Sequence, residues 1–167
     1  MVLIGGLLGL LIPASAAADE ELVVKQSDHL DYSLELEPHL LVAIGGPFGK
    51  DNPIGPGVRA TIPILPDGFL KRVNDSVGIG FGADFVSLGH GESVVAIPVV
   101  MQWNFWLSTH WTVFGEPGID FATGSGHHGN ALDPIIAVGG RYHFTRLLSL
   151  TLRGGYPGVS VGASFFF

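Results

Sequence analysis

Apolar and polar residues alternate along most of the chain with a period of two, the pattern of strands whose two faces meet different surroundings. From Tyr32 onward the alternation recurs in segments of about ten residues, the length that a tilted strand needs to cross a bilayer. Residues that favour turns separate these segments. The pattern predicts eight strands, at residues 32–44, 57–65, 76–88, 94–107, 111–121, 135–144, 148–154 and 159–167.

The polar face of these segments is unusual. In a soluble sandwich this face meets bulk water and carries many Lys, Glu, Thr and Gln residues, whereas here it carries Gly, Ser and a few charges of both signs. Small residues and paired ions suit the narrow interior of an eight-stranded barrel, and the apolar face then contacts lipid. The predicted interior charges are Glu35, Glu37, Arg59, Asp84, Glu116, Asp120, Arg141, His143 and Arg153. We therefore predict an all-β fold, an eight-stranded antiparallel up-and-down transmembrane β-barrel.

Composition supports this prediction. Only 14% of the 167 residues are charged, against about a quarter in soluble domains, and 47% are hydrophobic. No apolar stretch reaches the roughly 18 residues of a membrane-spanning helix, so the chain is apolar without a long apolar run. The net charge of −7 argues against nucleic acid as a partner, and the absence of cysteine removes disulfides and thiolate metal sites. No nucleotide-binding motif is present, and we expect no cofactor and no resident metal.

The N-terminus has the features of an export signal. An apolar run from Val2 to Ile12 is followed by Pro13 and small residues up to Ala18. No Lys or Arg precedes the run, and the alternative is an N-terminal anchor, for which the run is short. We expect a signal peptide at 1–18, a periplasmic lead-in at 19–31 and a barrel domain at 32–167.

An even number of strands places both ends of the barrel on the periplasmic side. The periplasmic connections are then 66–75, 108–110 and 145–147, and the external loops are 45–56, 89–93, 122–133 and 155–158. Because 66–75 is too long for a tight turn, we expect a helical turn at 69–72 on the membrane surface. An interfacial girdle of aromatic residues is predicted at the periplasmic strand ends, from Trp103, Phe105, Trp111, Tyr142, Phe144, Phe165 and Phe167.

Four prolines oppose the strand pattern, because proline removes a donor from the hydrogen-bond ladder. They are Pro38, Pro63, Pro98 and Pro117. Pro117 lies in the sequence Gly-Glu-Pro-Gly, where we expect a bulge or a break in the strand.

The chain ends in GVSVGASFFF. Together with the signal-like start and the eight alternating segments, this ending resembles the small outer-membrane β-barrels of Gram-negative bacteria, such as OmpA-type and OmpW-type barrels, over residues 32–167. The resemblance implies an outer-membrane location and contact with outer-membrane lipid and lipopolysaccharide. It also implies that a terminal aromatic, with apolar residues at alternate positions before it, is recognised by the barrel-assembly machinery. The matching residues are Val159, Val161, Ala163, Phe165 and Phe167. The family analogy gives fold and location but no specific role.

Two groups of residues could carry chemistry. The interior charges form either a salt-bridged plug or a narrow ion path. The segment SGHHGN at 125–130, with Asp133, faintly resembles the His-x-Ser-Asn element of lipid A deacylases, but Gly129 stands where the nucleophilic serine is needed. With His90, its histidines could instead bind a divalent metal, or the segment is a solvated loop.

The leading prediction is a non-enzymatic scaffold or a narrow conduit for small solutes. The alternatives are a lipid-modifying enzyme of the outer membrane and an exported lipocalin-like ligand binder. The sequence leaves the oligomeric state open.

Overall fold

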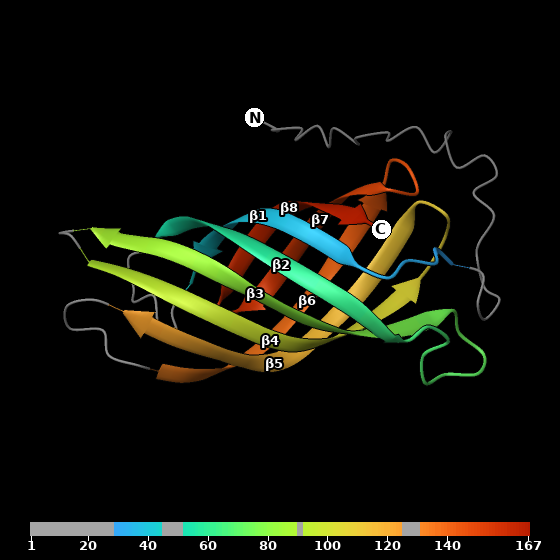
Figure 1. Cartoon of the computed structure of the whole chain (residues 1–167), viewed down its shortest axis with the longest axis horizontal. Helices are drawn as coiled ribbons and strands as arrows, with labels where there is room; N and C mark the ends of the chain where they lie inside the picture. Colours follow the sequence, from blue (N-terminus) through green and yellow to red (C-terminus); the bar gives the residue numbers. More distant parts are fainter. Residues whose placement is uncertain (1–28, 45–51, 90–91, 125–130) are drawn as a thin grey trace, which may run out of the picture.

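The wall of the molecule is one closed antiparallel β-sheet (Figure 1). The computed structural model describes residues 29–44, 52–89, 92–124 and 131–167. Each strand pairs with the next in sequence, and the first pairs with the last, so the predicted eight-stranded up-and-down barrel is confirmed. The strands are β1 (Glu35–Ala43), β2 (Ile54–Leu65), β3 (Asp75–Gly89), β4 (Glu92–Trp106), β5 (Trp111–Gly124), β6 (Ala131–His143), β7 (Leu148–Tyr156) and β8 (Gly158–Phe166). The predicted signal peptide and residues 19–28 of the lead-in lie outside the described residues.

Several strands extend beyond their predicted limits. β5 continues to Gly124 and β6 begins at Ala131, so Ala122↔Ala131 is a ladder pair inside the predicted loop 122–133. β1 instead starts later than predicted, at Glu35. Two neighbouring strands continue as long as their backbone N–H and C=O groups hydrogen-bond to each other. The side-chain pattern near a turn does not show where this pairing ends.

Burial alternates along the strands as the sequence pattern predicts. In β1 the polar residues Glu35, Glu37 and His39 are buried inside the barrel, and the intervening Leu36 and Leu40 are exposed outside. The same alternation holds through β8. The barrel therefore has a largely polar interior at its centre and an apolar outer wall.

The predicted irregularity at Pro117 is wrong. Pro117 pairs with Ile136 in an unbroken register with β6, and the pairs Trp103↔Gly115 and Val100↔Gly118 keep one register with β4. A proline costs one ladder hydrogen bond, but its backbone angle suits an extended strand, and neighbours on both sides hold the register here. Among the described strand pairs, the register shifts lie instead next to Pro63 in β2 and between Ser87 and Gly89 in β3.

The connection between β2 and β3 has no helical turn, contrary to the prediction for 69–72. It has two hydrogen-bonded turns, in which Gly68 N–H donates to Leu65 O and Val73 N–H donates to Leu70 O. The conformation of this connection is fixed by its contacts with Asp75 and the barrel wall, which are described below. The sequence of the connection alone does not reveal these contacts. In the part of the chain that the structure describes, no helix is long and apolar enough to cross a membrane.

Candidate functional site

A layer of four charged residues occupies the middle of the barrel. Arg153 donates from Nη1 and Nη2 to the two carboxylate oxygens of Glu37, at 2.9 Å each. Its Nε also lies 2.7 Å from Glu116 Oε2. Arg59 Nη1 donates to the same Glu116 oxygen at 2.8 Å, and Gln102 Nε2 donates to the other oxygen at 3.0 Å. Glu116 is thus shared between two guanidinium groups, an arrangement that offsets the cost of burying all four charges.

A second ionic layer lies towards the end that carries the C-terminus. Arg141, which is fully buried, has Nη2 at 2.8 Å from Glu35 Oε1 and donates from Nη1 to Asn104 Oδ1 at 2.8 Å. Its guanidinium carbon lies 4.4 Å from the centre of the Phe114 ring and 6.0 Å from that of Phe166. The cation is therefore held by one carboxylate, one amide and two ring faces.

Phe114 connects the two layers. Its ring also lies 5.4 Å from the guanidinium carbon of Arg153. A side chain on Gly139 would collide with this ring, so the glycine provides the space that Phe114 fills. Phe114 was absent from the predicted interior, although its place between Thr112 and Glu116 puts it on the same face by simple alternation.

Beyond the central layer, His39 and Asp84 form a buried pair, with His39 Nε2 at 2.7 Å from Asp84 Oδ1. Gly57 faces this pair, and a Cβ atom there would overlap both side chains. A cavity of about 30 Å³, the size of one water molecule, lies beside them and also touches Asp120. Asp120 is 1% exposed, and its Oδ1 has no hydrogen-bond partner among the described residues.

The interior becomes apolar near the end of the barrel away from the C-terminus. The buried cluster there consists of Leu41, Ala43, Val86, Val94, Ala96 and Ala122. These residues are not among the interior positions predicted from the sequence, which are all charged. The signal was present, because Leu41 continues the alternation of Glu37 and His39, and Val86 continues that of Asp84.

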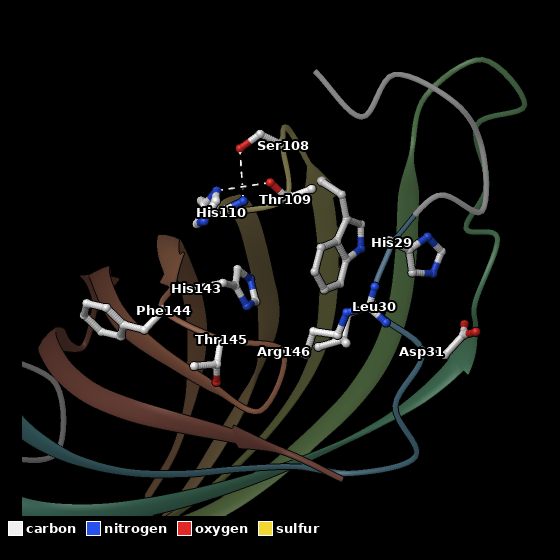
Figure 2. A pocket seen from close by; sticks show the side chains of 11 residues that line it. His29, Leu30, Asp31, Ser108, Thr109, His110, His143, Phe144, Thr145 and Arg146 are labelled. Carbon is white, nitrogen blue, oxygen red and sulfur yellow. Dashed lines mark hydrogen bonds between the residues drawn. The ribbon is translucent and has the colours of Figure 1, made fainter. Parts of the chain in front are cut away.

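At the opposite end, where the C-terminus lies, the barrel opens into a pocket of about 520 Å³ (Figure 2). Two stacked ring pairs line it, with ring centres 5.3 Å apart for His29 and Trp106 and 5.5 Å apart for Trp106 and His143. Behind them the ring of Phe166 is tilted against His143, with the centres 5.3 Å apart. Tyr32 packs edge-on against Phe166 at 5.1 Å. Burial, and then the charge of Glu35, raise the pKa of Tyr32 well above its usual value.

The polar groups that line this pocket are engaged in the local structure. Ser108 Oγ accepts the backbone N–H groups of His110 and Trp111, which fixes the turn between β4 and β5. His143 Nε2 lies 2.9 Å from Thr112 Oγ1. Within residues 29–44, 52–89, 92–124 and 131–167, no three His, Cys, Asp or Glu side chains are placed to hold a metal ion. This end of the barrel is therefore a pocket lined by aromatic rings and by polar groups that hydrogen-bond to one another.

All nine predicted interior charges are buried, and none exceeds 6% exposure. The ion pairs described above include seven of them; Asp120 lies at the small cavity, and His143 lies in the mouth. The proposed catalytic or metal-binding motif at 125–130, together with His90, lies outside the described residues. Asp133, its expected neighbour, is on β6, where Tyr156 Oη donates to it at 3.4 Å.

The predicted assembly-signal residues lie along β8 with their side chains outward, and Phe165 and Phe167 are 39% and 65% exposed. The intervening Phe166 faces inward and is 1% exposed. The backbone of Phe167 is bound to the start of the barrel, because its carbonyl accepts the N–H of Ser33 and its N–H donates to Leu34 O.

Outward-facing aromatic side chains form contacts at the same end of the wall. Trp103 lies 4.9 Å from Phe105, and Tyr142 lies 5.0 Å from Trp111 and 5.2 Å from Phe144, measured between ring centres. These residues belong to the predicted interfacial girdle.

No protein-family model matches the chain, and no curated protein matches its sequence. Among solved structures, the crystal structure of Neisserial surface protein A is similar, with a TM-score of 0.41 and 11% sequence identity over 80% of this chain and 94% of that chain. At this identity and score, the similarity says nothing about the activity, partners or location of the chain.

Proposed function

We propose that this chain is an outer-membrane β-barrel of a Gram-negative bacterium, exported with cleavage of its signal peptide, and that it acts as a membrane-embedded scaffold. The observation that carries the proposal is its inverted burial. Leu40, Ile136 and Val138 are 54%, 69% and 68% exposed on the outer wall, whereas Glu116 and Arg141 are fully buried inside. Each large apolar side chain left in water costs about 1.5–3 kcal/mol relative to burial, and contact with lipid removes that cost.

The filled interior favours a scaffold over a conduit. From the mouth inward, the described interior holds stacked rings, two ionic layers joined by Phe114, the His39–Asp84 pair and an apolar cluster. An ion crossing this interior would have to displace buried pairs, each of which is expensive to break.

The proposed partners follow from the outer surface. The apolar wall would contact outer-membrane lipid and lipopolysaccharide. The outward residues of β8 and the residue after it, namely Val159, Val161, Ala163, Phe165 and Phe167, would be bound by the barrel-assembly machinery. With the aromatic girdle at the interface, the C-terminus and the pocket of Figure 2 would face the periplasm.

Two alternatives receive less support. A lipocalin-like binder needs an apolar interior and a polar exterior, and this barrel has the reverse pattern over most of its length. A deacylase-like enzyme needs a nucleophile and base in the segment 125–130, where Gly129 stands at the position of the nucleophilic serine.

Cell fractionation followed by gel electrophoresis with and without heating tests the proposal. We expect the protein in the outer-membrane fraction, soluble only in detergent, with faster migration before heating than after. A detergent-free protein in the soluble periplasmic fraction would contradict the proposal. Planar-bilayer recording separates the two roles: a scaffold gives no stepwise conductance, and reproducible steps would favour the conduit.

A further inference from the structure

The connection between β2 and β3 lies at the end of the barrel that carries the C-terminus (Figure 1), and it contacts the outer wall through Asp75 and Trp103. Asp75, the first residue of β3, has its side chain on the outer side of the wall, because its neighbour Ser76 points inward and accepts the indole N–H of Trp106. Asp75 is nevertheless fully buried, and Val77, on the same outer side, is 1% exposed. The chain itself therefore covers this part of a wall that is elsewhere exposed, although the alternation pattern predicted that Val77 faces lipid.

The Asp75 carboxylate organises this covering segment. Its Oδ2 accepts the indole N–H of Trp103 at 2.8 Å and the backbone N–H of Phe69 at 2.9 Å, and its Oδ1 accepts the N–H of Leu70 at 3.3 Å. Gly68 has a positive φ of 55°, and a Cβ atom there would overlap the carboxylate. The loop thus has a defined conformation, fixed by a buried carboxylate and a glycine that fits against it.

This conformation presents a compact surface of apolar and basic residues, which we call the 69–73 surface. Phe69, Leu70 and Val73 are 57%, 40% and 39% exposed, and the ring of Phe69 stands edge-on to Trp103 at 5.8 Å. Lys71 and Arg72, between them, are exposed. The segment combines apolar side chains continuous with the girdle and two adjacent cations in five consecutive residues.

The charge of this end of the barrel is distinctive. Within the described ranges, the exposed Lys and Arg residues are Lys71, Arg72 and Arg146, and all three are in turns at the end that carries the C-terminus. Arg59, Arg141 and Arg153 are inside the barrel. The exposed basic side chains of the described residues are thus all at this end of the wall.

We propose that the 69–73 surface binds the headgroups of anionic phospholipids in the membrane leaflet that faces the periplasm. This inference rests on the proposed membrane location. Phe69, Leu70 and Val73 insert at the level of the headgroup and acyl boundary, as apolar residues of interfacial segments do. Lys71 and Arg72 then lie beside the lipid phosphates, where each basic residue contributes about a five-fold preference for an anionic surface. Asp75 is a positioning residue, because it holds the loop against the wall.

The absence of cysteine allows a site-specific test on the full chain. Val73→Cys, carrying a fluorophore, is refolded into phosphatidylcholine vesicles that contain a small fraction of nitroxide-labelled phosphatidylglycerol or nitroxide-labelled phosphatidylcholine. We expect labelled phosphatidylglycerol to quench the probe at least about five-fold more effectively per molecule. In the same background, Lys71→Gln/Arg72→Gln should bring the ratio close to one, whereas the charge-conserving Lys71→Arg/Arg72→Lys should retain it.

The outcomes are distinguishable. Equal quenching by the two lipids, in a barrel that has inserted and shows heat-modifiable migration, would overturn this inference and leave the proposed function intact. A ratio that persists in Lys71→Gln/Arg72→Gln would also overturn it, because the selectivity would then come from elsewhere. Failure of the unmodified chain to insert into either kind of vesicle would overturn the proposed function and this inference with it.

Discussion

Replacing Glu116 by Gln removes the one negative charge that Arg59 and Arg153 share in the central layer. The substitution keeps the shape of the side chain and an oxygen that can accept from Gln102. Arg153 retains its two hydrogen bonds to Glu37, but Arg59 loses its 2.8 Å contact with a carboxylate. The guanidinium group of Arg59, a residue that is 6% exposed, therefore loses the negative charge that compensated for its burial.

The expected magnitude follows from this geometry. Removing one partner of a buried ion pair costs about 3–5 kcal/mol, because the remaining charge stays buried without compensation. The unfolding equilibrium constant should then rise by more than about two powers of ten. A whole domain is stable by only about 5–15 kcal/mol, so the variant should remain folded under mild conditions but unfold at clearly lower denaturant concentration.

Urea titration of the refolded barrel, followed by tryptophan fluorescence and by heat-modifiable migration, measures this loss. The variants Glu116→Gln, Arg59→Gln and their combination form a double-mutant cycle, and the combined variant should be more stable than the sum of the single losses predicts. Arg146→Gln, at an exposed cation, is the control and should leave the midpoint unchanged. A loss below about 1 kcal/mol for Glu116→Gln, or strict additivity in the cycle, would refute the view that paired charges hold the centre of the barrel together.

Three further predictions concern the ends of the barrel. Phe166→Ala should lower the free energy of unfolding by about 3–5 kcal/mol, since this ring is buried against Tyr32. Phe167→Ala should leave the free energy of unfolding nearly unchanged but slow the assembly of the barrel in cells. Equal effects of the two variants on stability and on assembly would mean that both residues serve only in packing. Burial raises the pKa of Tyr32, so the folded state holds the phenol proton more tightly than the unfolded state, and this contribution to stability is complete below pH 10 and is lost as the pH rises through the folded pKa. In urea titrations, the stability of Tyr32→Phe should therefore decline less steeply with alkaline pH than that of the unmodified protein. An identical decline would contradict the assignment. Asp75→Asn should increase protease cleavage between Gly68 and Val73 in detergent-solubilised protein, and unchanged cleavage would show that the carboxylate does not fix the loop.

Strict alternation is the reason that so much of this fold is predictable from sequence. Once Glu35 and Glu37 are placed inside, every second residue of the strand follows, and hydrogen bonding around a closed sheet leaves little freedom in strand order. The predictions fail where a contact depends on residues distant in sequence. Examples are the shared role of Glu116 between Arg59 and Arg153, and the covering of Val77 next to the Asp75-bound loop.

The apolar cluster at one end and Phe114 at the centre were missed for a different reason. Their positions in the alternation place them inside, but they are apolar, whereas the predicted interior residues are charged. In a narrow barrel, a phenyl ring between two guanidinium groups is as effective a filler as a polar side chain, because the ring face attracts both cations. For predicting which residues face the inside of such a barrel, the position of a residue in the strand alternation is therefore a better guide than its polarity.

The pairing of β1 with β8 has a consequence for how the chain reaches its final form. Ser33 and Phe167, which bond through Ser33 Oγ and the Phe167 carbonyl, are 134 positions apart in sequence. Until β8 has been synthesised, β1 has an open hydrogen-bonding edge and the wall cannot close. Closure across so long a separation is slow, so the open edge of β1 is exposed to aggregation until the wall closes. The pairing of β1 with β8 thus makes β1 dependent on a strand that is synthesised long after it. A chain truncated before β8 lacks the strand that closes the barrel in this structure.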